Sequence, residues 1–175
     1  ANGLVAMEGQ ALASSAEANL ALGFTRVALA DLTAALERAS EASDPRLVAA
    51  VSGALGNAYL LLRQYPPAEE HIVKSVEIAR RIGDRAILAS AANNLGNLLA
   101  ATGRSDKALA AYAESAAAAG AAGDYQVQLV AARNAARLQL RNGEASEALH
   151  SAESAMSAAQ RMPTSHARML GLVSV

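Results

Sequence analysis

The stretch Leu55-Gly56-Asn57 returns as Leu95-Gly96-Asn97, a shift of 40 residues. Three further sets of matches keep the same interval: Ala28/Ala68/Ala108/Ala148, Gly23/Gly103/Gly143 with Arg63 at the fourth place, and Ser43-Asp44/Gly83-Asp84/Gly123-Asp124. Self-similarity at a fixed period of this size is typical of repeat proteins. The sequence therefore predicts a single repeat domain over residues 1–175, with four units at about 9–48, 49–88, 89–128 and 129–168.

The composition predicts that each unit is built from helices. About a quarter of the chain is Ala, the best helix former, whereas aromatic residues make up only 3%. In the second unit we expect one helix over about 46–62 and another over about 66–82. Pro66 and Pro67 then fall in a first helical turn, where proline is tolerated. Residues 1–8 are expected to extend the first helix backwards.

Residues suited to helix ends support the same division of each unit into two helices. Glycines at 23, 103 and 143 are placed to end the first helix of their units, because glycine readily adopts the left-handed conformation found there. Thr25 and Ser105 are predicted N-caps of the second helices, since their hydroxyls can accept from free backbone N–H groups. The Gly-Asp pairs at 83–84 and 123–124 are expected to form the turn into the next unit.

The spacing inside each unit resembles the tetratricopeptide (TPR) repeat. The matching residues of the second unit are Leu55, Gly56, Tyr59, Ala68, Ile72 and Ser75, and those of the third are Leu95, Gly96, Leu99, Ala108, Tyr112 and Ser115. The period of 40 and the Leu-Gly-Asn phrase are similar to the longer-helix TPRs of polarity adaptor proteins and of bacterial arrays associated with CHAT domains. The resemblance implies an all-α, right-handed superhelical solenoid of antiparallel helix pairs that binds other proteins.

Several function classes find no support in the sequence. The net charge is −1, so no overall positive field attracts nucleic acid. The chain has no Cys, and no apolar run approaches the ~20 residues of a membrane span. His71, His150 and His166 belong to no ligand or catalytic motif. We therefore predict no catalytic, cofactor or metal residues and no membrane or nucleic-acid partner; the sequence does not indicate a cellular compartment.

The resemblance implies that certain positions of each unit's first helix line a concave groove. The candidate peptide-binding residues at these positions are Asn57, Asn93, Asn94, Asn97, Arg133, Arg137 and Arg141. The three arginines are four residues apart and share one helix face. Asn can both donate to and accept from a peptide backbone, and Arg pairs with carboxylates. The sequence therefore predicts a scaffold that holds an acidic or carboxylate-bearing peptide or protein segment.

Three other interpretations of the groove and of the chain stay open. The arginine row could be a solvated face, or the groove could hold another part of the same parent protein. The chain could also be a regulatory or oligomerisation module of a larger enzyme, such as a CHAT-type protease, with its partner in cis. Residues 169–175 are expected to begin a fifth unit or form a capping helix. Their apolar edge is a candidate surface for self-association.

Overall fold

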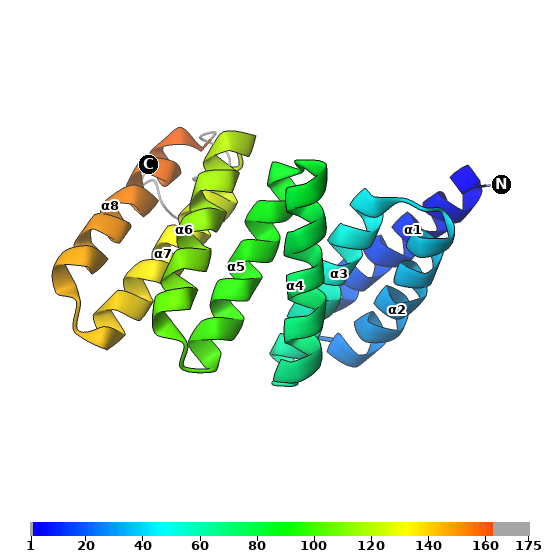
Figure 1. Cartoon of the computed structure of the whole chain (residues 1–175), viewed down its shortest axis with the longest axis horizontal. Coiled ribbons are helices and arrows are strands. Elements are labelled where there is room, and N and C mark those ends of the chain that lie inside the picture. The colour runs from blue at the N-terminus through cyan, green and yellow to red at the C-terminus, as the bar shows by residue number, and fades with distance from the viewer. Residues whose placement is uncertain (1, 163–175) are drawn as a thin grey trace.

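In the computed structural model, residues 2–162 are described, and they form a curved row of helices (Figure 1). The elements are α1 (Asn2–Ala21), α2 (Thr25–Glu41), α3 (Pro45–Leu61), α4 (Tyr65–Ile82), α5 (Arg85–Ala101), α6 (Ser105–Ala122), α7 (Tyr125–Asn142) and α8 (Ala145–Arg161). No strand occurs within residues 2–162. The fold class is confirmed as an all-α solenoid of paired helices. The terminal helix predicted at 169–175 lies outside the described residues.

The helices repeat at the interval found in the sequence. The odd-numbered helices α3, α5 and α7 begin at residues 45, 85 and 125, and the even-numbered helices begin at 25, 65, 105 and 145. The two helices predicted for the second unit are each correct to within one residue. Helix α1 begins at Asn2, so the predicted backward extension of the first helix is also present.

The turns that lead into α3, α5 and α7 are capped by aspartate. The side chains of Asp44, Asp84 and Asp124 each accept a hydrogen bond of 3.0 Å from the backbone N–H three residues further on. Before two of these aspartates, Gly83 and Gly123 have φ values of 72° and 74°, a region that strongly favours glycine. The Gly-Asp pairs therefore form the turns predicted from the sequence.

The turns that lead into the even-numbered helices differ from the prediction. Thr25 and Ser105 are the first helical residues of α2 and α6, not their N-caps. The capping positions are held by Phe24 and Arg104, which make no side-chain capping bond. Gly103 takes a left-handed conformation and Arg104 follows it as the N-cap, so Ser105 falls one residue too late in the chain to cap the helix.

The two helices of a pair approach closely because small residues lie between them. Ala68, Ala108 and Gly96, three of the residues that match the TPR spacing, are buried. Gly96 lies against the ring of Tyr112 on the neighbouring helix α6. The buried Ser115 hydroxyl donates to the carbonyl of Ala89 over 2.7 Å, and Ser75 makes the equivalent bond to Ala49 at the same distance.

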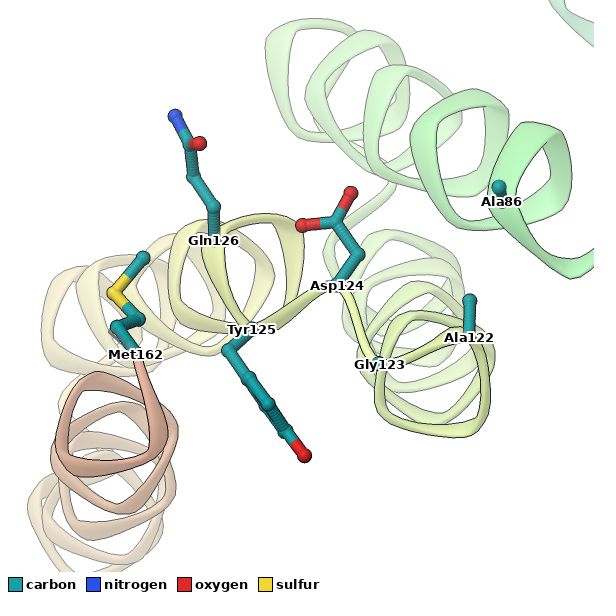
Figure 2. Close-up of a pocket in the computed structure, with 7 residues that line it drawn as sticks. All are labelled: Ala86, Ala122, Gly123, Asp124, Tyr125, Gln126 and Met162. Atoms are coloured by element: carbon teal, nitrogen blue, oxygen red, sulfur yellow. The ribbon is translucent and has the colours of Figure 1, made fainter. Parts of the chain in front are cut away.

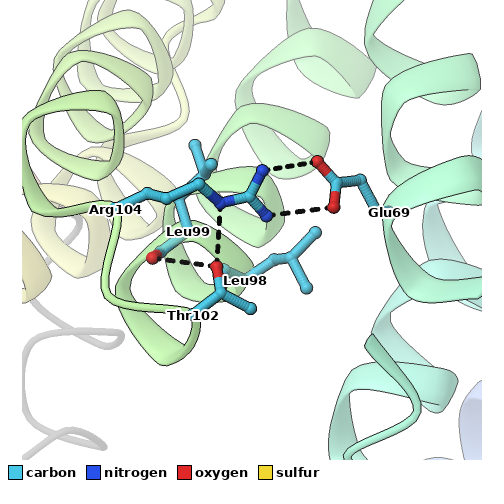
Figure 3. A network of polar contacts seen from close by, with 5 residues as sticks. All are labelled: Glu69, Leu98, Leu99, Thr102 and Arg104. Atoms are coloured by element: carbon cyan, nitrogen blue, oxygen red, sulfur yellow. Dashed lines mark hydrogen bonds and ion pairs between the residues drawn. The ribbon is translucent and has the colours of Figure 1, made fainter. Parts of the chain in front are cut away.

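Neighbouring pairs are tied together by ion pairs. Figure 3 shows Arg104, in the turn before α6, donating two hydrogen bonds of 2.7 and 3.0 Å to the carboxylate of Glu69 on α4. These bonds hold the pKa of the Glu69 carboxyl below its ordinary value. The Arg104 Nε also donates to the Thr102 hydroxyl at 3.0 Å, which fixes the guanidinium plane.

The odd-numbered helices form the inner row of the stack. Helix α3 contacts both α1 and α5, and α5 contacts α7, in addition to the contacts within and between pairs. In a curved stack the more closely spaced row lies on the concave side. Side chains of α3, α5 and α7 that point away from the even-numbered helices therefore line the concave surface.

Candidate functional site

A hollow of about 540 Å³ crosses the inner faces of α5 and α7. Its lining residues are Leu60, Asn93, Asn97, Ala100, Ala101, Tyr112, Val130, Arg133, Asn134, Arg137 and Arg141. Five of the seven residues predicted from the sequence are among them: Asn93, Asn97, Arg133, Arg137 and Arg141. We call this hollow the arginine hollow.

One wall of the arginine hollow is the arginine row of α7. Arg133, Arg137 and Arg141 are four residues apart on a continuous helix, so their side chains share one face. All three residues are exposed. Within residues 2–162, the ion pairs involve other arginines, and none of these three guanidinium groups has a carboxylate partner. The row is therefore a set of uncompensated positive charges.

The opposite wall is an asparagine network on α5. The buried Asn134 of α7 donates from its amide nitrogen to the side-chain oxygens of Asn93 at 3.1 Å and Asn97 at 3.3 Å. The Tyr112 hydroxyl also donates to the Asn97 side-chain oxygen, over 2.9 Å. These bonds occupy the oxygens of Asn93 and Asn97 and fix the orientation of both side chains.

The network decides which polar groups remain available to a ligand. Among the described residues, no protein acceptor lies on the amide nitrogens of Asn93 and Asn97. An asparagine whose oxygen is already bonded presents only its two N–H donors. The polar groups of the arginine hollow without a protein partner are therefore mostly donors, namely two amide NH₂ groups and three guanidinium groups, and the side-chain oxygen of Asn134 is an acceptor among them.

Tyr112 connects the site to the core. Burial raises the pKa of its hydroxyl, and the charges of Arg137 and Arg141 oppose that rise. A neutral phenol is thus maintained at ordinary pH, and it acts as a hydrogen-bond donor to Asn97. Tyr112 also packs against Gly96 of α5, so the same ring fills the core and supports the asparagine network.

Asn134 and Tyr112 were not predicted from the sequence as parts of the site. Asn134 lies 40 residues after Asn94, a predicted groove residue, so the repeat itself could have indicated it. Tyr112 was identified as a repeat-pattern residue, and its bond to Asn97 depends on side-chain geometry that the sequence does not give.

Asn57 and Asn94, the other two predicted residues, line a second hollow of about 390 Å³. It lies across α1, α3 and α5, and the carboxylate-bearing Glu17 is also part of its lining. The Asn94 side chain donates to the backbone oxygen of Gly53 at 3.5 Å, which links α5 to α3. The structure therefore brings five predicted residues together and places two in the adjoining hollow, on the other side of α5.

A third hollow, of about 400 Å³, lies between the ends of helices near Met162 (Figure 2). Of the described residues that line it, Asp124 alone carries a charge at neutral pH. That carboxylate already caps α7 through its bond to the Val127 N–H. This hollow therefore offers a ligand fewer free charged groups than the arginine hollow does.

The described residues contain no group of three or more His, Asp or Glu side chains arranged to hold a metal ion. No helix within residues 2–162 is both long and apolar enough to cross a membrane.

Comparison with known proteins identifies the fold of this chain. No protein-family model matches the chain, and no curated protein matches it in sequence. Among solved structures, it is similar to MamA with a TM-score of 0.65 and 16% identity, over 87% of this chain and 79% of MamA. It is also similar to BtubC from P. vanneervenii with a TM-score of 0.73 and 20% identity, over 95% of this chain and 66% of BtubC. The fold is a TPR-like helical solenoid.

At these identities the likeness concerns the fold alone. It supports the TPR-like part of the resemblance seen in the sequence, whereas the branch with a period of 40 residues stays a prediction. A solenoid of this kind can present many different surfaces, so the fold by itself does not indicate what this chain binds.

Proposed function

We propose that this chain is a protein-interaction scaffold whose arginine hollow holds an acidic or carboxylate-bearing segment of a partner protein. The observation that carries the proposal is that the three guanidinium groups lack carboxylate partners and the free groups of Asn93 and Asn97 are donors, because Asn134 and Tyr112 occupy the oxygens of both asparagines. A ligand that matches this surface must supply acceptors and negative charge. A carboxylate supplies both.

The division of roles follows from the chemistry of each group. The arginines can each hold a carboxylate through two parallel hydrogen bonds. The amide nitrogens of Asn93 and Asn97 can donate to carbonyl oxygens of an extended backbone, which requires no particular side chain. Charged residues of the segment would thus be selected by α7, and its main chain would be positioned by α5.

The charges of the row favour binding for a second reason. Three like charges at helical spacing repel one another modestly, and a bound carboxylate relieves that repulsion. Because the guanidinium groups are exposed, dissolved ions screen them over ~8 Å at physiological ionic strength. Binding should therefore weaken markedly with salt.

The test compares two hexapeptides of the same shape. One ends in Asp-Glu with a free carboxylate, and the other ends in Asn-Gln with an amide. We expect measurable binding of the first peptide only, weakening between about 50 and 500 mM salt. The double variant Arg133→Gln/Arg137→Gln should lose roughly tenfold in affinity, at about 1 kcal/mol or less for each exposed charge pair.

Arg81→Gln is the matched control, because Arg81 is an exposed arginine on α4, outside the arginine hollow. It should bind the acidic peptide as the parent does. Equal affinity for both peptides, or an affinity that neither salt nor the double variant changes, would overturn the proposal.

A further inference from the structure

The hollow of about 390 Å³ across α1, α3 and α5 carries the opposite charge to the arginine hollow. Of the described residues that line it, Glu17 alone carries a charge at neutral pH, and it is exposed. Within residues 2–162 the Glu17 carboxylate makes no ion pair. We call this space the glutamate hollow. Its unpaired carboxylate makes it a negative site on the same inner row of helices.

The other polar groups of the glutamate hollow suit a basic side chain. The Asn94 amide nitrogen donates to the Gly53 oxygen at 3.5 Å, so the Asn94 side-chain oxygen is left as an acceptor. The exposed Ser90 hydroxyl also lines the hollow, and no described residue bonds to it. The ammonium group of Lys and the guanidinium group of Arg are donors only, so they need oxygens of this kind as partners. The glutamate hollow can therefore hold a Lys or Arg side chain.

The two hollows are joined by a row of equivalent residues. Glu17, Asn57, Asn97 and Arg137 are 40 residues apart, one on each of the inner helices α1, α3, α5 and α7. Consecutive helices of this inner row are in contact. The first two residues line the glutamate hollow, and the last two line the arginine hollow. The row therefore crosses the concave surface from a negative charge at α1, past two amides, to a positive charge at α7.

The length of the row sets the length of a segment that could use both ends. From α1 to α7 there are three spacings between contacting helices, at 8–10 Å each, which gives roughly 25–30 Å. An extended chain advances ~3.3 Å per residue, so about eight or nine residues cover this distance. Between the two ends, the Asn57 side chain has no partner among the described residues, and it can both donate to and accept from a main chain.

We infer that the concave surface binds an extended partner segment with a Lys or Arg side chain in the glutamate hollow and carboxylates in the arginine hollow. The inference rests on the proposed function for the α7 end and adds a second contact at the α1 end. The occupant is argued from charge complementarity at both ends of the row. A segment that is acidic along its whole length would bring a carboxylate to Glu17, so the glutamate hollow disfavours it.

Peptides that differ in one basic residue test the inference. Each is about ten residues long, with an Asp-Glu pair at one end, Lys or Gln at the other end, and uncharged residues between. The N-terminus is acetylated, so that Lys is the only cation. Both chain directions are made, because the charges fix the order of residues across the groove and not the direction of the peptide bonds. In at least one direction, the parent should bind the Lys peptide about two- to fivefold more tightly than the Gln peptide at low salt.

Glu17→Gln should abolish this preference and leave the affinity for the Gln peptide unchanged. Glu37→Gln is the matched control, because Glu37 is an exposed glutamate of α2, outside both hollows. It should bind the Lys peptide with the same preference as the parent. A preference that survives in Glu17→Gln, or no preference in either chain direction, would overturn the inference.

The acidic hexapeptide separates failure of this inference from failure of the proposed function. At about 20 Å when extended, it is too short to reach from α7 to α1. If the hexapeptide binds and no Lys peptide is preferred, the proposed function stands and the inference is wrong; if no peptide binds, both are wrong.

NMR gives a second readout at the α1 end. The methyl signals of Leu20, which lines the glutamate hollow on α1, should shift with the preferred Lys peptide and not with the hexapeptide. Leu20 signals that do not move under saturating Lys peptide would contradict the inference.

Discussion

Replacing Gly96 with Ala tests the close packing of α5 on α6. A Cβ atom at this position would lie 2.5 Å from two carbons of the Tyr112 ring, whereas ordinary contacts begin at 3.4 Å. The ring must therefore move by roughly 1 Å, since the repulsion at shorter distances is steep. Tyr112 is 2% exposed and its hydroxyl is bonded to Asn97, so it has little room to move.

Three contributions set the expected change in the free energy of unfolding: two lower it and the third raises it. Overpacking of a well-packed core costs about 1–3 kcal/mol. Loss of the bond between Tyr112 and Asn97 adds about 1 kcal/mol. Ala is favoured over Gly inside a helix by about 1 kcal/mol, which offsets part of this. We expect the free energy of unfolding of Gly96→Ala, measured by urea titration with circular dichroism, to fall by about 1–3 kcal/mol.

The repeat offers a matched control for this experiment. Ala16 and Leu32 occupy the equivalent positions in the first helix pair, and both are fully buried. In a Tyr112→Leu background, Gly96→Ala should therefore be neutral or stabilising by up to about 1 kcal/mol. If Gly96→Ala stabilises the parent, or costs the same in both backgrounds, the proposed contact with the Tyr112 ring is wrong.

Three smaller predictions concern hydrogen bonds and protonation. Ser115→Ala should lower the free energy of unfolding by about 1 kcal/mol in urea titrations, because it removes a buried bond, while the exposed Ser14→Ala should not. Asp84→Ala should cost about 1 kcal/mol in the same assay through loss of a helix cap, and the exposed Asp106→Ala much less. Burial lowers the pKa of His71 below its ordinary 6.5, so the unfolded chain takes up a proton more readily. Stability measured by urea titration should therefore fall as the pH drops below about 6.5, and His71→Gln should reduce that dependence.

The sequence predicted correctly those features of the fold that recur in successive repeat units. Equivalent residues 40 apart predicted the helix pairs and the Gly-Asp turns, because both depend on local chemistry that is repeated along the chain. The N-caps were wrong at Thr25 and Ser105 because these residues are the first of their helices, and the residues before them, Phe24 and Arg104, hold the capping positions.

The candidate site could be predicted only in part. The arginine row follows from helical spacing, so it was visible in the sequence. The role of Asn134 was not visible, because it depends on α5 and α7 being close enough for its amide to reach Asn93 and Asn97. For the same reason, the sequence did not separate Asn94 from Asn93: these neighbours lie on different sides of α5 and line different hollows.

The most direct test of the proposed function observes the side-chain amides of the groove by NMR during titration with the acidic hexapeptide. The NH₂ signals of Asn93 and Asn97 should shift in proportion to occupancy, because these are free donors in the arginine hollow. The NH₂ signal of Asn94 should stay nearly unchanged, since it is bonded to Gly53 and lies in the other hollow. The Asn-Gln amide peptide should shift none of them. Shifts centred on Asn94, or none at Asn93 and Asn97 under saturating peptide, would contradict the account.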